Sequence, residues 1–218
     1  MERIRGLASE FAQVPSTLHG QLFLLAFDPK QGRFDGYDVT LFGYALRAAM
    51  LADLYLAGYL VERDGRAVPG RAASPDNLVL RATFAQVGVH NRTTWAQLVA
   101  GNAHEATSAV REQLLTEGWL RAGRGAVRAV PVANLEPYDP CRVGALADSV
   151  SGALRDAIAG LPADSWLLAL GLLAVLARLP GVADIVADVE PGRLQDLVQG
   201  AIAPVRGMAE AIKGRPAW

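Results

Sequence analysis

The side chains that could carry acid, base or metal chemistry are few and far apart. The three histidines, His19, His90 and His104, share no spacing typical of metal ligands, so we expect each to have a packing or surface role. Cys141 is the single cysteine, which excludes an intramolecular disulfide and leaves structural zinc unsupported. The sequence therefore predicts no metal site and no cofactor.

The carboxylates and motifs likewise give no catalytic constellation. The sequence has no G-x-S-x-G elbow, no HExxH pair and no G-x-x-x-x-G-K-[ST] loop. The segment GRGAVR lacks the third glycine of a dinucleotide fingerprint. The aspartates are scattered, and no spacing pairs them for general acid and base work, so we predict a protein that is not an enzyme.

Two charged residues, Arg47 and Asp53, interrupt the apolar run from Val39 to Leu60. A run of this length is about enough to cross a membrane. However, two charges at the centre of a span cost about 5–7 kcal/mol, and each large apolar residue recovers only about 0.3–0.6 kcal/mol. The run is therefore predicted to be a core helix that other helices cover on most sides.

A buried Arg47 needs an acceptor, and two interpretations are open. The guanidinium pairs with a carboxylate from another segment or with Asp53, although a spacing of six places Asp53 on a different helical face. Alternatively, Arg47 binds an external anion.

Composition predicts one globular domain in a reducing, cytoplasmic compartment. The chain has 218 residues, 51% of them hydrophobic, a formal net charge of -1 and a pI near 6.3. The charge balance argues against a nucleic-acid partner, because such proteins usually carry a basic excess. We divide the chain into an N-terminal arm, residues 1–15, and a helical domain, residues 16–218.

Caps and turns predict the order of the elements. Ser16 and Asp38 are expected to cap the first helix and the central helix, and Asp64-Gly65 predicts a small hairpin. Helices then follow near 76–88, 94–101 and 105–117, a second hairpin is centred on Gly123 and Gly125, and the last third is helical with a break at Pro204. The predicted fold is mainly α: a single-domain helical bundle around a buried central helix, with two small β-hairpins.

The second predicted hairpin combines basic and apolar residues: Trp119, Arg121, Arg124 and Arg128. Such a surface could rest on an anionic membrane, where each basic residue near the headgroups contributes about 1 kcal/mol. It could also contact another subunit, which we favour, or simply cover its own core.

Two stretches, ALRAAMLADLYLAGYL from residue 45 and VREQLLTEGWL from residue 110, together with the order of elements, resemble the Golgi phosphoprotein 3 family and its bacterial branch. The resemblance implies a mainly helical fold and a protein that is not an enzyme. Eukaryotic members bind phosphatidylinositol 4-phosphate on Golgi membranes and hold glycosyltransferase tails there. For this chain the resemblance implies an adaptor or peripheral membrane-binding protein.

The resemblance also points to residues for an anion or lipid headgroup. The arginine that the family has in its central helix falls on Arg47, and the family's two later arginines fall on His104 and Thr107. Tyr37 is the aromatic residue nearest to the position of the family's tryptophan. The expected partners are an anionic phospholipid headgroup, a protein partner and further copies of the chain, at the inner face of the membrane. The alternative is a cytosolic module that binds a small anionic ligand or a protein without lipid.

Overall fold

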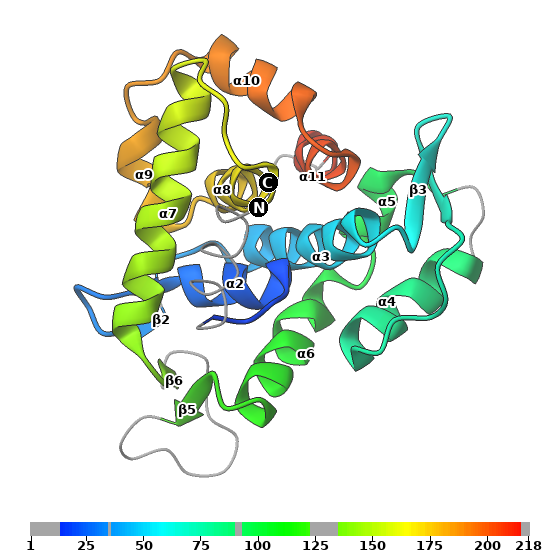
Figure 1. Ribbon diagram of the computed structural model, residues 1–218, viewed down its shortest axis with the longest axis horizontal. Coiled ribbons are helices and arrows are strands. Elements are labelled where there is room, and N and C mark those ends of the chain that lie inside the picture. Colours follow the sequence, from blue (N-terminus) through cyan, green and yellow to red (C-terminus); the bar gives the residue numbers. More distant parts are fainter. Residues whose placement is uncertain (1–13, 35, 90–92, 123–134, 215–218) are drawn as a thin grey trace, which may run out of the picture.

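The computed structural model describes residues 14–34, 36–89, 93–122 and 135–214. Within these residues, helices predominate, and the strands form only two-stranded antiparallel sheets (Figure 1). This confirms the predicted mainly α fold. The helices are α2 (Leu18–Leu25), α3 (Val39–Leu56), α4 (Leu78–Val89), α5 (Trp95–Ala100), α6 (Ala103–Thr116), α7 (Pro140–Ile158), α8 (Ser165–Leu176), α9 (Pro180–Val186), α10 (Pro191–Gly200) and α11 (Ala203–Lys213).

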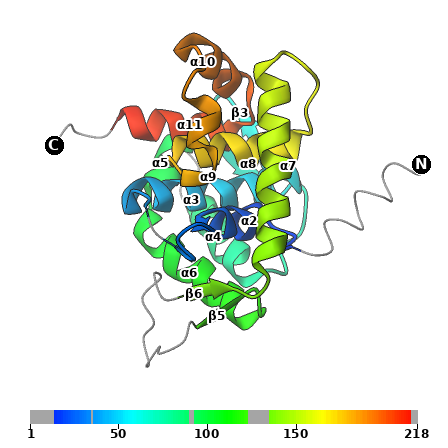
Figure 2. The same cartoon turned by 90° about the vertical axis from the view of Figure 1, so that its left-hand side faces the viewer.

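Helix α3 is the axis of the fold, as predicted from its apolar sequence. The Asp38 side chain caps it by accepting hydrogen bonds from the backbone N–H groups of Thr40 and Leu41. Helices α2, α4, α5, α6, α8 and α11 all contact it (Figures 1 and 2). The helix is long and apolar enough to cross a membrane, but 72% of that stretch is buried inside the fold. Its apolar surface is therefore covered by protein, which is the behaviour of a core helix.

The hairpin predicted at Asp64-Gly65 is formed by β3 (Leu60–Arg63) and β4 (Arg66–Pro69). Both turn residues have positive φ, 51° and 73°, as a tight two-residue hairpin turn requires. A further hairpin, β1 (Phe27–Asp28) with β2 (Arg33–Phe34), lies between α2 and α3 and was not predicted. Its strands have two residues each, too short for an alternating pattern to appear in the sequence.

The second predicted hairpin has a different register from the one expected. Strand β5 (Leu120–Ala122) pairs with β6 (Leu135–Pro137), so that Leu120 lies opposite Pro137. The partner strand thus comes later in the chain than the apolar flank after Gly125, and that flank lies outside the described residues.

The first helix begins one residue later than predicted, and the break at Pro204 is where it was predicted. Thr17, not Ser16, caps α2, and its hydroxyl accepts a hydrogen bond from the Gly20 backbone at 3.3 Å. Pro204 interrupts the C-terminal helical stretch as predicted: α10 ends at Gly200, and Pro204 lies in the first turn of α11. Proline is tolerated there because the first N–H groups of a helix have no partner within the helix.

Gly43 allows α3 and α6 to approach closely. A Cβ atom at this position would lie 2.6 Å from the Ala103 carbonyl oxygen, which is backbone and cannot rotate away. Gly43→Ala should therefore lower the free energy of unfolding by about 1–3 kcal/mol, measured by chemical denaturation. Gly152→Ala on α7 is the matched control, because nothing lies within 4 Å of its Cβ. Because Gly152 is inside a helix, Gly152→Ala should raise the free energy of unfolding by about 0.5–1 kcal/mol. Equal effects at both sites would contradict the close approach.

Candidate functional site

Arg47 lies on the buried face of α3 with 4% of its surface exposed. Its Nε donates a hydrogen bond to the Leu98 carbonyl oxygen at 3.1 Å, and Nη1 donates to the Thr83 hydroxyl at 3.1 Å. Nη2 donates to the Gln86 side-chain oxygen. All three acceptors are neutral, so the guanidinium is held in place without its charge being neutralised by them.

Asp53 is not the partner of Arg47, because it is engaged with α2. Its carboxylate accepts from the Leu18 backbone N–H at 2.8 Å and from the His19 backbone N–H at 3.3 Å. It also forms an ion pair with His19 Nδ1 at 2.6 Å. Within the described residues Arg47 forms no ion pair, neither with Asp53 nor with a carboxylate from another segment.

Burial changes the electrostatics of Arg47. Desolvation lowers the pKa of its guanidinium to about 10, and the nearby carboxylate of Glu105 partly opposes this shift. Arg47 is therefore still charged at neutral pH, but its charge is poorly solvated. An anion next to the guanidinium would offset that cost.

A cavity of about 360 Å³ gives such an anion a place beside Arg47. Apart from Arg47, the residues that line it are uncharged: Gln86, Thr93, Gln97, Leu98, Gly101 and Asn102. They come from α4, from α5 with the residues before it, and from the turn between α5 and α6. The cavity thus has one positive charge, and its side-chain amides and hydroxyl suit a ligand with hydroxyl groups and a negative charge.

Two glutamine side chains of the cavity have their donor groups available. The Gln86 Oε1 atom accepts from Arg47, and the Gln97 Oε1 atom accepts from the Thr94 backbone N–H at 2.9 Å in a capping box. These donors fix the amide orientations and leave both Nε2 groups without a partner among the described residues. Together with the guanidinium, they make the site rich in donors and suited to an acceptor such as phosphate or carboxylate.

The other residues predicted for an anion site do not line this cavity. The Tyr37 ring packs against Phe42, with ring centroids 4.5 Å apart. The His104 side chain is 81% exposed and lies 3.6 Å from the Glu105 carboxylate, and Thr107 is half-buried on α6. Gln86 and Gln97 were not predicted as site residues. The Thr94-x-x-Gln97 spacing could have indicated the capping box, but nothing in it indicates a cavity.

Only part of the predicted contact hairpin can be placed. Trp119 is half-buried against the core, and Arg121 forms an exposed ion pair with Glu136 at 3.1 Å. Arg124 and Arg128 lie outside the described residues, as does His90. A role for this hairpin in subunit or membrane contact stays a prediction.

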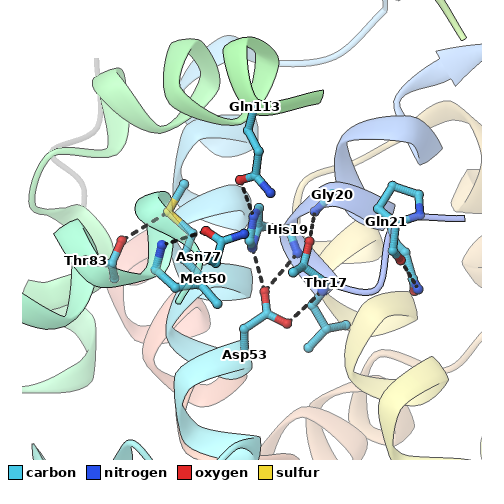
Figure 3. A network of polar contacts seen from close by, with 12 residues as sticks. Thr17, His19, Gly20, Gln21, Met50, Asp53, Asn77, Thr83 and Gln113 are labelled. Carbon is cyan, nitrogen blue, oxygen red and sulfur yellow. Dashed lines mark hydrogen bonds and ion pairs between the residues drawn. The ribbon is translucent and has the colours of Figure 1, made fainter. Parts of the chain in front are cut away.

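The most polar part of the interior is centred on His19, which is fully buried (Figure 3). Its Nδ1 faces Asp53, and its Nε2 lies 3.0 Å from the Gln113 side-chain oxygen. Gln113 Nε2 donates to Glu117 at 2.8 Å, which fixes that amide orientation. Both ring nitrogens therefore face side-chain oxygens of neighbouring helices. This network joins α2, α3 and α6, and because neither ring nitrogen is open to solvent, it is a structural clamp.

The described residues of the two polar sites hold no metal-binding cluster and no paired nucleophile and base. Among the residues that the structure describes, no three His, Cys, Asp or Glu side chains are grouped so that they could hold a metal ion. At the Arg47 cavity the groups are hydrogen-bond donors without an adjacent nucleophile and base. The fold and the site thus define a mainly helical protein whose central helix presents a buried cation to a donor-lined cavity.

A sequence model of the Golgi phosphoprotein 3 (GPP34) family matches residues 18–212. The match covers most of the chain, and the chain belongs to this family. A search of curated proteins found no match.

Proposed function

We propose that this protein is a non-enzymatic adaptor or peripheral membrane-binding protein that takes an anionic lipid headgroup at the Arg47 cavity. The observation that carries the proposal is the buried guanidinium, bonded to neutral acceptors and lining a cavity without a second charged residue in its described lining. A phosphate with hydroxyl groups matches this set of donors. Family membership supports the same class of function.

The proposed place of action is the cytoplasmic face of a membrane. Once a headgroup is bound, the hairpin formed by β5 and β6 would add contacts to the membrane or to a second copy of the chain. A protein partner completes the adaptor role.

Liposome flotation tests the membrane part of the proposal. We expect the folded protein to float at low salt with phosphatidylcholine vesicles that contain phosphatidylglycerol or phosphatidylinositol 4-phosphate, and not with phosphatidylcholine alone. High salt should weaken flotation, because headgroup attraction is partly electrostatic. Failure to float with either anionic vesicle at low salt would remove the membrane function.

The variant Glu105→Gln should bind anionic vesicles more tightly than the unchanged protein. The Glu105 carboxylate acts on the charge of Arg47, and in a headgroup complex it would repel the ligand. Its removal should strengthen vesicle binding about two- to fivefold, which is the scale of an exposed charge pair. Glu112→Gln on the same helix is the control, because Glu112 is also exposed and lies beside Arg111. Equal gains for both variants would mean that only net charge matters.

A second candidate function is the binding of a soluble anion without lipid. It is favoured by the Arg121–Glu136 ion pair, which neutralises one of the basic residues expected to face a membrane. A thermal-shift assay with inositol monophosphate and glycerol phosphate addresses this candidate, since a ligand of the native state raises the melting temperature. Stabilisation by these compounds without flotation would favour it.

A further inference from the structure

A second cavity, of about 420 Å³, shares no lining residue with the Arg47 cavity. The proposed function does not use it. It opens between α7, the end of α8 with α9, and the β1–β2 hairpin. Helices α7 and α9 lie side by side in both views of the fold (Figures 1 and 2). The size is within the range of small-molecule sites.

The walls of this cavity are largely apolar, and they come from elements far apart in sequence. Aliphatic and aromatic side chains form them: Leu25, Phe27, Val143, Leu179, Val182 and Ile185. A ligand that fills the cavity must therefore have an apolar body, because burying such a body against these side chains removes apolar surface from water.

One face of α7 adds three polar groups in a fixed order. Asp148, Ser151 and Arg155 all line the cavity, and their spacing of three and four places them on one side of the helix. At 1.5 Å per residue, the acidic and the basic positions are about 10 Å apart along the axis. Asp184 on α9 also lines the cavity. The lining thus carries charges of both signs, and the Asp148 and Arg155 positions lie about 10 Å apart along α7.

These groups have no partners of their own in the described part of the chain. Asp148, Arg155 and Asp184 form no ion pair there. Ser151 is 8% exposed, and its hydroxyl makes no hydrogen bond with the described residues. The contrast with Ser149 is direct, since the exposed Ser149 hydroxyl donates to the Ala145 carbonyl oxygen at 2.9 Å. The Ser151 hydroxyl faces the cavity, where a polar group of a ligand would bond to it.

Two more charged residues line the cavity, Asp28 and Lys30, from the β1–β2 hairpin. Asp28 accepts hydrogen bonds from the backbone N–H groups of Lys30 and Gln31, so one of its carboxylate oxygens is committed to the β1–β2 turn. Lys30 is exposed.

We propose that this cavity binds a linear aliphatic zwitterion, with an ammonium group at one end and a carboxylate at the other. Asp148 and Asp184 hold the ammonium group, Arg155 holds the carboxylate, and the Ser151 hydroxyl bonds to the ligand between them. The apolar walls contact the chain. This site is independent of the Arg47 cavity. If the zwitterion does not bind here, the proposed function at Arg47 is unaffected.

The test is a calorimetric titration of the full chain with ω-aminooctanoate, compared with octanoate and octylamine. We expect the zwitterion to bind at least about tenfold more tightly than either singly charged compound, because each charged end gains a charge-assisted hydrogen bond. Octanoate or octylamine binding as tightly as the zwitterion would overturn the proposal, and so would the absence of binding to folded protein.

Matched variants assign the ends of the ligand. Asp148→Asn should reduce ω-aminooctanoate binding to the level of octanoate, and Arg155→Gln should reduce it to the level of octylamine. Ser151→Ala should weaken binding by about three- to tenfold, whereas Ser149→Ala and the exposed Asp156→Asn should leave it unchanged. Circular dichroism confirms the fold of each variant. Equal losses for Ser151→Ala and Ser149→Ala would overturn the assignment.

Discussion

Replacing Asp53 by alanine should lower the free energy of unfolding by about 3–5 kcal/mol, the largest effect that we expect of any single polar substitution. Asp53 is 6% exposed, and its carboxylate accepts hydrogen bonds from two backbone N–H groups of α2 as well as from the His19 ring. Its removal leaves the buried His19 ring and two first-turn N–H groups of α2 without that acceptor. Urea denaturation followed by circular dichroism measures the change.

A graded series separates charge from hydrogen bonding at this position. Asp53→Asn keeps an acceptor oxygen but loses the charge, so it should cost less than Asp53→Ala. Asp156→Ala, also on a helix but exposed, should change stability by no more than about 0.5 kcal/mol. If Asp53→Ala were as mild as the Asp156 control, the His19 network would not hold α2 against α3.

Arg47→Met should weaken anion binding strongly while leaving a folded protein. Methionine fills a similar volume without a charge, so the desolvation cost of the guanidinium disappears while three acceptors lose their donor. These changes oppose each other, and we expect stability to change by less than about 2 kcal/mol. Affinity for inositol monophosphate should fall about ten- to hundredfold, since the ligand loses its charged donor. Calorimetric titration measures the affinity, and denaturation measures the stability.

Arg206→Met is the matched control for this variant. Arg206 is also partly buried, but it is paired with Glu62 at 2.7 Å and lies on α11, outside the Arg47 cavity. Its substitution should leave anion affinity unchanged. Arg47→Lys should retain part of the affinity, because a lysine keeps the charge but lacks the planar set of donors that reaches several acceptors at once. If Arg206→Met weakened binding as much as Arg47→Met, general charge would explain the effect.

Much of the fold could be predicted because its signals are local. The long apolar run with Asp38 before it predicted α3, and Asp64-Gly65 predicted the β3–β4 turn from conformations that those two residues adopt readily. Pro204 likewise marked the boundary between α10 and α11. The short β1–β2 pairing and the register of β5 with β6 were missed, because pairing over two or three residues depends on tertiary packing.

The site was less predictable because its parts are far apart in the chain. The acceptors of Arg47 lie 36, 39 and 51 residues away, and the residues that engage Asp53 lie 34 and 35 residues away. Spacing within α3 suggested only that Arg47 and Asp53 occupy different faces. Which acceptor each one meets is decided by how α2, α4 and α5 pack on α3. Neutral glutamines carry no sequence signal for an anion site, because their role depends on which amide atom is already bonded.

One NMR titration shows whether the Arg47 guanidinium receives an anion in its cavity, as we propose. The Nε–H signal of Arg47, assigned by its absence in Arg47→Met, is followed as inositol monophosphate is added. We predict a saturable shift of this signal together with the side-chain amide signals of Gln86 and Gln97. If these three signals stayed in place while the protein still floated with anionic vesicles, headgroup recognition would lie elsewhere on the molecule, and the role assigned to Arg47 would be wrong.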